Sequence, residues 1–431
     1  MASDSYRYRY GETSPSAAVI ATSQQANVGD LVAYNSSTIT RAEDQAWNST
    51  LSQTQTDFVA KFLGVSAQRK NANQTQPGTG GGPAGFVRVD TGGVFEFACA
   101  SATFNVGDLV GCAKDTGNAL LSQTVRPDGI DLNFQVLSVE ETFFRMLRNR
   151  EFDAAELSMS SYCVTLGRDN PDFIAIPVFP SRFFRHSCIF VSAKSGIEKP
   201  SDLVGKRIGV PEYQMTAPVW IRGILQDEYG IDPASVTYVT GGEEEPGREE
   251  KLKLNLPDKF KVEPIGPNQT LTRMLADGEI DALHTARAPS TFYSEPHNVR
   301  RLFPDFVQVE KAYFGKTNIF PIMHVVAIRR DIYEKNRWIA QALYKAFVQA
   351  QQLTYEQLRV SASLKTMLPW QIAAVEETIA TLGDQWWPYG IEKNRHVLET
   401  FTRYHHEQGL SPRQLTIEDM FAPETFAEFK I

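Results

Sequence analysis

The sequence has little cysteine, no long apolar run and no excess of basic charge. Its 431 residues include four cysteines (Cys99, Cys112, Cys163 and Cys188) without a Cys-x-x-Cys pair, which argues against a disulfide framework or a cysteine-rich zinc site. The sequence has no run of about 18 apolar residues, so no membrane helix is predicted. The net charge of −8 argues against binding nucleic acid through a basic face. The polar first ten residues contain no apolar signal core, so we expect a cytoplasmic protein.

The first part of the chain also lacks histidine, because all seven histidines follow residue 125. Charged residues number 18 among the first 125 residues and 76 among the remaining 306. The first part holds 13 of the 29 glycines, and five of the six tryptophans lie in the second part. This change in composition predicts two units, residues 1–125 and residues 126–431.

Residues 1–125 have the pattern of a small β-rich unit. Residues 86–89 and 94–97 are short alternating runs bounded by turn residues, which predicts strands. The string Asn-Val-Gly-Asp-Leu-Val occurs at residues 27–32 and again at 105–110, and Gly-Asp before an apolar pair suits a turn that enters a strand. The repeat marks two equivalent hairpins of one barrel or sandwich, or else it arose by chance. The unit weakly resembles phage-type structural proteins, and we expect no chemistry from it.

From residue 126 onward, strand patterns alternate with helix patterns. Such alternation predicts a mostly parallel sheet covered by helices, with the site at the carboxyl ends of the strands. Ser138 and Glu141 have the spacing of a helix cap. Strands are predicted at residues 130–136, 152–157, 173–179, 188–191, 206–210 and 280–283, and helices at residues 138–147, 219–229, 271–276 and 339–353.

Five strings in the second unit are more specific than a general α/β pattern. They lie at residues 156–162, 177–187, 209–223, 280–289 and 320–326. Together they resemble the 4,5-dihydroxyphthalate decarboxylase family across residues 126–431. The resemblance implies a two-lobed, type II periplasmic-binding-protein-like α/β fold with a ligand cleft between the lobes. It also implies removal of one carboxylate from 4,5-dihydroxyphthalate to give protocatechuate.

The resemblance further implies where the lobes divide. Lobe one would contain residues 126–190 and 320–431, lobe two residues 195–312, and the strands at 188–191 and 320–326 would be the crossings. Members of the family begin with a further strand and a polar loop before the equivalent of Arg126. Here residues 117–125 take that position, so we expect the strand to be absent, with Leu120 and Leu121 as a possible substitute. The change near Val125 keeps open a third hypothesis, that the chain is an inactive fusion.

The substrate class that the resemblance implies is an aromatic dianion, which requires cations and hydrogen-bond donors. Serines follow a predicted strand end, arginines lie within the family strings, and the turn before the helix near residue 219 would present amides to an anion. The candidate binding residues are Ser158, Ser160, Ser161, Arg182, Arg185, Tyr213, Gln214, Met215, Thr216, Thr285 and Arg287.

Decarboxylation of an electron-rich ring requires an acid at the ring carbon and a base at the para hydroxyl. Histidine suits both roles near neutral pH. The candidates are His186, His284 and His324, with Glu156 and Glu212 as secondary groups for proton handling. A core or hinge role stays open for each histidine, and an interlobe ion pair stays open for Arg182 and Arg185. We expect residues 243–250 to form a solvated loop and His405 and His406 to lie on the surface.

Two functions therefore compete for the second unit. The first is decarboxylation of a dihydroxylated aromatic dicarboxylate without an added cofactor, with the metal requirement left open. The alternative is a solute-binding protein that captures an aromatic carboxylate without reacting it. The sequence does not indicate an oligomeric state.

Overall fold

The computed structural model describes residues 119–426 in full and, between residues 7 and 110, the backbone of strands β1 to β8. The chain divides into two compact units, Met1–Asn105 and Val106–Ile431. This division comes earlier than the predicted boundary at residue 125. In the first unit, β2 (Pro15–Val19), β6 (Phe86–Asp90), β5 (Phe62–Ser66), β3 (Leu31–Asn35) and β4 (Thr38–Arg41) pair in that order, and β1 (Arg7–Tyr10) pairs with β7 (Val94–Glu96).

The second copy of the repeated string lies on the other side of this division. In both copies a strand begins directly after Gly-Asp, at Leu31 in β3 and at Leu109 in β8 (Leu109–Val110). However, β8 belongs to the second unit, where it runs parallel to β9 (Asn133–Phe134) and contacts β10. The two copies are therefore not equivalent hairpins of one domain.

The strand β8 lies ahead of residue 126, but it is not a central strand of lobe one. It pairs with β9 in a separate two-stranded sheet, outside the three-stranded sheet of lobe one, so the expected central strand is absent from the described strands of that sheet. Leu120 and Leu121 do not substitute for it, because residues 119–121 are helical and Leu120 is buried in the core. The residues at the end of the repeated string thus contribute a strand to the α/β unit.

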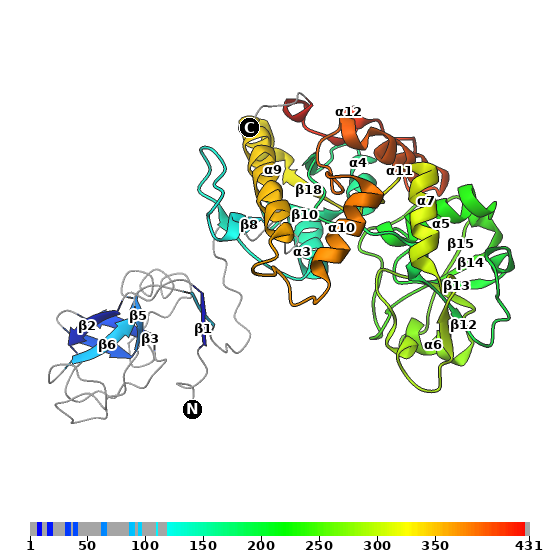
Figure 1. The fold of residues 1–431 in the computed structure, drawn as a ribbon, viewed down its shortest axis with the longest axis horizontal. Coiled ribbons are helices and arrows are strands. Elements are labelled where there is room, and N and C mark those ends of the chain that lie inside the picture. Colours follow the sequence, from blue (N-terminus) through cyan, green and yellow to red (C-terminus); the bar gives the residue numbers. More distant parts are fainter. Residues whose placement is uncertain are drawn as a thin grey trace. The chain divides into compact units, whose positions relative to one another are not determined.

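Lobe one is built from two separate parts of the sequence, coloured cyan and yellow to red in Figure 1. Its sheet has the order β10-β18-β11, with β18 (His324–Arg329) antiparallel to both β10 (Ala154–Ser158) and β11 (Phe173–Ile176). The Ser138 side chain accepts a hydrogen bond from the Glu141 amide, which confirms the predicted helix cap. The helices of lobe one are α3 (Val139–Phe144), the π-helical turn Arg145–Asn149, α4 (Met159–Leu166), α8 (Arg330–Lys335), α9 (Trp338–Arg359), α10 (Gln371–Leu382), α11 (Arg395–Glu407) and α12 (Ile417–Met420).

Lobe two is the green to yellow part of the chain in Figure 1, which ends with the yellow helix α7. Its six strands have the order β15-β14-β13-β16-β12-β17, and the first four of these are parallel. They are β12 (Ile189–Ser192), β13 (Arg207–Val210), β14 (Thr237–Thr240), β15 (Lys261–Pro264), β16 (Ala282–His284) and β17 (Val299–Arg301), with helices α5 (Thr216–Tyr229), α6 (Leu271–Asp277) and α7 (Phe306–Thr317). Ile189 and Phe190, which we predicted in lobe one, pair with the lobe-two strands β16 and β17.

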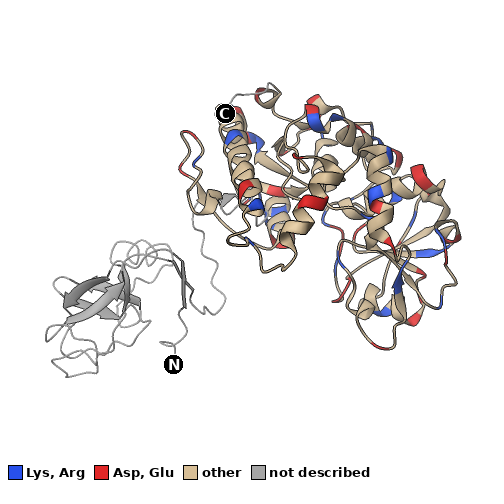
Figure 2. Ribbon diagram, in the orientation of Figure 1, with Lys and Arg blue, Asp and Glu red and all other residues tan. Residues whose placement is uncertain are grey.

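Two connections cross between the lobes, near the predicted positions. The first runs from β11 to β12 and the second leads into β18, and an antiparallel bridge between Arg182 and Ile322 joins them. The indole of Trp220, on α5, is fully buried and donates a hydrogen bond to the Ile322 carbonyl at 2.8 Å. The α/β architecture with two lobes is therefore the one that the sequence predicts for this unit. Lysine and arginine are interspersed with aspartate and glutamate over both lobes (Figure 2).

Candidate active site

A cavity of about 320 Å³ lies between the two lobes. Lobe one contributes α3, the end of β10 and the start of β18, and lobe two contributes the start of α5 and the segments after β13, β14 and β16. The lining residues are Val139, Glu140, Phe143, Ser158, Ser161, Ser181, Phe183, Arg185, Glu212, Met215, Thr216, Ala217, Arg248, Lys251, Ala286, Arg287, Met323 and His324.

The sheet of lobe one places a histidine and a carboxylate together at this cavity. Because β18 is antiparallel to β10, it begins where β10 ends, and His324 lies opposite Ser158. Glu156 is two residues earlier on β10, so its side chain is on the same face as His324. The Glu156 carboxylate is buried and lies 2.6 Å from Nδ1 of His324. Phe143 packs its ring against the imidazole edge to face, and Nε2 is the nitrogen left for a ligand.

Two helices, one from each lobe, begin at the cavity and are bonded to each other. Ser158 caps α4 by accepting a hydrogen bond from the Ser161 amide. The Thr216 hydroxyl, at the start of α5, lies 2.8 Å from the Ser158 hydroxyl and accepts a hydrogen bond from the buried Ser160 amide at 3.0 Å. Met215, Thr216 and Ala217 at the start of α5 line the cavity, and this helix has no side-chain cap among the described residues, so its N-terminus favours an anion there.

Arg185 brings a buried positive charge to the cavity without a matching carboxylate. Its Nε donates to Met323 Sδ at 3.1 Å, and one Nη donates weakly to Cys188 Sγ and the Ala286 carbonyl. Among residues 119–426, no carboxylate forms an ion pair with it. Burial lowers the pKa of Arg185, because removal from water disfavours the charged form. A ligand carboxylate would supply the missing partner.

The wall formed by lobe two is mainly cationic. Arg248 donates to the Glu212 carboxylate at 2.6 Å, and Lys251 pairs with the same carboxylate, which is buried. Arg287 lies 2.5 Å and Arg248 lies 3.5 Å from the Glu140 carboxylate of lobe one. Together with Arg185, the cavity thus has four cations and two carboxylates among its lining residues. The two positive charges in excess match a dianion.

Several predicted residues lie outside the cavity lining. Both ring nitrogens of His186 and of His284 are buried without a hydrogen-bond partner, and burial lowers their pKa values to about 4 and about 3, with Arg222 lowering that of His284 further. His186 packs among the rings of Tyr229, Phe303 and Tyr313. The structure therefore brings His324, alone of the three candidate histidines, to the cavity.

The remaining candidates outside the lining support the cavity walls. Arg182 donates to the carbonyls of Phe320 and Pro388, at 2.9 Å each, and to Asn394, so it ties the two crossings to the C-terminal region. Tyr213 donates its hydroxyl to the Gln408 carbonyl, Gln214 donates to Glu212, and Thr285 donates to Glu243. Ser160 contributes its amide to the Thr216 bond described above.

Comparison with known proteins gives a consistent assignment. A family profile described as "NMT1/THI5 like" matches residues 184–245. The 4,5-dihydroxyphthalate decarboxylase of Comamonas testosteroni is 39% identical over 317 residues, which cover 74% of this chain and 96% of that protein. The chain belongs to this decarboxylase family. The Pseudomonas putida enzyme of the same name is 47% identical over 43% of this chain and 72% of its own length. The periplasmic aliphatic sulphonate binding protein SsuA of Escherichia coli aligns over 74% of this chain and 98% of its own with a TM-score of 0.42 and 14% identity.

In this decarboxylase homologue, the cavity residue Arg248 belongs to the segment 243–250, which we expected to be a solvated loop. Residues 243–250 do form a loop, and residues 244–247 and 249 are exposed as expected, but Glu243, Arg248 and Glu250 turn inward. Glu243 is buried and accepts a hydrogen bond from Thr285 at 2.7 Å, the Glu250 carboxylate accepts one from the Tyr213 amide, and Arg248 enters the cavity. A mostly acidic segment does not reveal which side chains turn inward, so the sequence contained no signal for Arg248 or Lys251.

His405 is a second correction within the decarboxylase unit, because we predicted it on the surface. It is fully buried on α11, with Nδ1 3.0 Å from the Ser411 hydroxyl and Nε2 3.3 Å from the Ser160 carbonyl. Burial lowers the pKa of His405 to about 3. Its neighbour His406 is exposed, as expected. His405 thus supports the first turn of α4 from behind.

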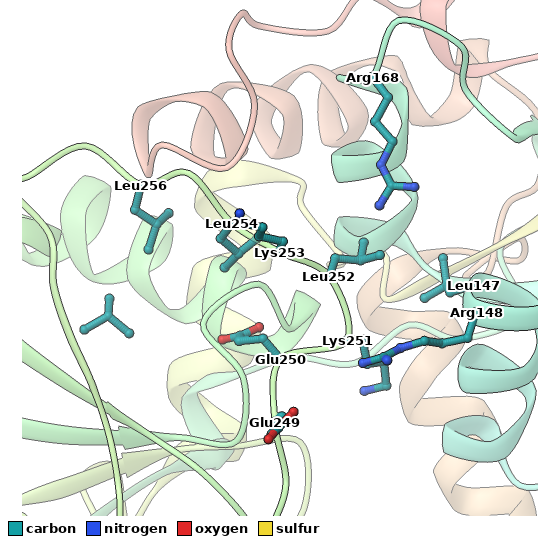
Figure 3. A pocket seen from close by; sticks show the side chains of 11 residues that line it. Leu147, Arg148, Arg168, Glu249, Glu250, Lys251, Leu252, Lys253, Leu254 and Leu256 are labelled. Carbon is teal, nitrogen blue, oxygen red and sulfur yellow. The ribbon is translucent and has the colours of Figure 1, made fainter.

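A second hollow of about 700 Å³ adjoins the cavity, and Lys251 lines both. Figure 3 shows its side chains, which come from the segment 249–256, from Leu147 and Arg148 after α3, and from Arg168 after α4. Within residues 119–426 there is no group of three or more histidine, cysteine, aspartate or glutamate side chains placed to hold a metal ion. Nor does any helix of the described residues have the length and apolar character to cross a membrane.

Proposed function

We propose that this chain removes one carboxylate from 4,5-dihydroxyphthalate, giving protocatechuate and carbon dioxide. Each carboxylate of this substrate is para to a hydroxyl, which can donate electron density to the carbon that carries the carboxylate. A proton adds to that carbon, the bond to the carboxylate breaks, and its electron pair restores the aromatic ring. The dianionic substrate and one proton thus become a monoanionic product and carbon dioxide.

The excess positive charge of the cavity supports recognition of this dianion. Arg185 can form a charge-assisted hydrogen bond with one substrate carboxylate, since it lacks a carboxylate partner among residues 119–426. The first amides of α5 and the Arg287 guanidinium can receive the other. The Ser158 and Ser161 hydroxyls line the wall of lobe one and can hydrogen-bond the substrate hydroxyls.

His324 is the group best placed to transfer the proton. The Glu156 carboxylate lies against Nδ1, which favours a proton on that nitrogen and orients the ring so that Nε2 faces the cavity. An imidazolium can donate the Nε2 proton to the ring carbon and recover it from solvent after carbon dioxide leaves. In this mechanism Glu156 orients and stabilises the histidine, while Glu212 holds Arg248 and Lys251 in the opposite wall.

One observation carries the proposal: a histidine oriented by a buried carboxylate shares a cavity with a buried arginine that has no carboxylate partner among the described residues 119–426. The test is to incubate the full chain with 4,5-dihydroxyphthalate and to quantify protocatechuate by chromatography and carbon dioxide by release from carboxyl-labelled substrate. We expect equal amounts of the two products. Tight calorimetric binding of the substrate with no carbon dioxide release would instead favour the alternative, a binding protein for aromatic carboxylates.

The remaining expectations for this chain stay proposals. We propose that the first unit is a β-rich domain without a catalytic role, that the two lobes have the type II arrangement, and that the reaction takes place in the cytoplasm without an added cofactor. The resemblance of the first unit to phage-type structural proteins stays a prediction. Activity of the full chain, compared with residues 106–431 alone, would test whether the first unit contributes.

A further inference from the structure

Glu140 is a carboxylate of lobe one that lies against two cations of lobe two. One of its oxygens, Oε1, is 2.5 Å from Nη2 of Arg287 and 3.5 Å from Nη1 of Arg248. Burial alone would raise the pKa of Glu140, but the two guanidinium groups outweigh burial and lower it. The protein therefore places its own carboxylate at the cationic wall of the cavity.

The two arginines depend on Glu140 to different degrees. Arg248 has a second partner, because its Nε and Nη2 donate to the buried Glu212 carboxylate at 2.9 and 2.6 Å. Arg287 has Glu140 as its one ion-pair partner among residues 119–426. The side chains of Arg287 and Glu140 are 58% and 41% exposed, and an exposed ion pair of this kind contributes little free energy. Glu140 can therefore leave Arg287 at small cost, while Arg248 stays bound to Glu212.

The geometry points to Glu140 as an internal competitor for anionic ligands, so that a ligand carboxylate takes its place at Arg287 and the Glu140 side chain turns to solvent. The identity of the ligand, an aromatic ring with two adjacent carboxylates, rests on the proposed function, but the exchange itself does not. Exchanging one carboxylate for another conserves the charge at Arg287. Glu140 would thus act as a residue that sets the affinity and the selectivity for dianions.

The same contacts have an opposite interpretation, in which Glu140 serves as a clamp between the lobes. Glu140 is on α3 of lobe one, and both arginines belong to lobe two. If its main effect were to hold the lobes closed around a ligand, removing its charge would weaken binding. The sign of the change in affinity therefore separates an internal competitor from a clamp.

The experiment measures binding of phthalate, the dicarboxylate without ring hydroxyls, by calorimetry to the full chain and to two variants. Glu140→Gln removes the competing charge, and we expect the Kd to fall about threefold, as for loss of one exposed ion pair. Glu141→Gln is the matched control. This neighbouring carboxylate on the same helix lies outside the cavity lining and pairs with Arg145 at 3.0 Å. We expect its Kd to equal that of the unchanged chain.

Weaker or unchanged binding to Glu140→Gln would overturn the inference, and so would equal tightening in both variants, which would indicate a general charge effect. Absence of phthalate binding to all three proteins would overturn it as well. Because phthalate binding requires no turnover, the result is separate from the proposed function. If Glu140→Gln binds phthalate more tightly but the unchanged chain makes no protocatechuate, the inference about Glu140 holds and the proposed decarboxylation is wrong.

Discussion

The two walls of the cavity differ in the chemistry they contribute. The wall of lobe one has the His324–Glu156 pair, serine hydroxyls and the Phe143 ring, whereas the wall of lobe two has Arg248, Arg287 and the start of α5. Under the proposed function, proton transfer belongs to the wall of lobe one, and recognition of negative charge belongs to the wall of lobe two together with Arg185 of the first crossing. The site is complete when the lobes meet, so changes in one wall should alter kcat and changes in the other should alter KM.

The strongest test of this division is to remove the imidazole from lobe one. We expect His324→Asn to lower kcat about 10²- to 10⁴-fold, because a positioned general acid contributes that much. The KM should change little, since the cations of lobe two are untouched. Steady-state assay of protocatechuate formation measures both constants.

The matched control is His186→Asn, which changes a histidine that lies outside the cavity lining. Its turnover per folded molecule should equal that of the unchanged chain. Equal losses of kcat in the two variants would mean that His324 contributes through packing rather than through proton transfer.

The next largest effect should come from the buried arginine without a carboxylate partner. We expect Arg185→Met to raise the Kd for phthalate roughly 30-fold or more, about 2 kcal/mol, because a desolvated charge pair with the ligand is lost. The stability of the free protein should stay the same or rise, since an unpaired buried charge is replaced by an apolar side chain. Calorimetry and urea unfolding measure the two quantities.

Arg182 lies in the same string as Arg185, residues 177–187, but we expect its substitution to affect stability rather than ligand affinity. Its guanidinium bonds the Phe320 and Pro388 carbonyls and Asn394, so Arg182→Met leaves those acceptors without their donor. We expect loss of stability by about 1–3 kcal/mol with little change in ligand affinity of the folded fraction. If the effects of the two substitutions were exchanged, the assignment of Arg185 to the ligand would be wrong.

The contact that joins the two walls should have a smaller effect. Thr216→Val removes the hydroxyl that bonds Ser158 and the buried Ser160 amide. An unsatisfied buried donor costs about 1–3 kcal/mol, so we expect lower stability in urea unfolding and a higher KM because the lobes close less readily. Thr216→Ser keeps the hydroxyl and should restore both. A valine variant with unchanged KM would show that this contact has no part in closure.

The pattern of the second unit predicted the α/β architecture, because its strands and helices have clear periodicities and caps. The strand predicted at residues 188–191 is β12 at Ile189–Ser192, and the helix predicted at 339–353 is the core of α9. Ser158 lies opposite His324 because of the antiparallel register of β10 and β18, and the two residues are 166 positions apart in the sequence. A single sequence does not contain that register, so His324 could not be distinguished from His186 and His284.

The charged segment 243–250 shows a second physical limit on prediction from sequence. A glutamate in a run of charges is usually solvated, but Glu243 is buried because Thr285 and the backbone contacts of Thr272 hold it beneath the wall of lobe two. The energetic balance between desolvation and a few hydrogen bonds depends on neighbours that are distant in the sequence. The family resemblance identified the neighbourhood of the site, whereas tertiary contacts decided which side chains face the cavity.

The smallest expected effect concerns stability alone and tests this buried support of the lobe-two wall. Burial raises the pKa of Glu243 from 4.5 to about 7, because the charged form is desolvated, so the folded protein holds a proton that the unfolded chain has released. The stability that this proton provides is complete below about pH 4.5 and is lost as pH rises through 7. Glu243→Gln cannot titrate, so its free energy of unfolding should exceed that of the unchanged chain by more at pH 8 than at pH 5. Glu244→Gln alters the exposed neighbour that bonds Ser290, and because the Glu244 charge also helps to raise the pKa of Glu243, this variant should show a smaller gain in the same direction. Urea unfolding of the three proteins at both pH values measures the difference, and an equal gain at pH 5 and pH 8 would show that the carboxylate does not titrate in this range.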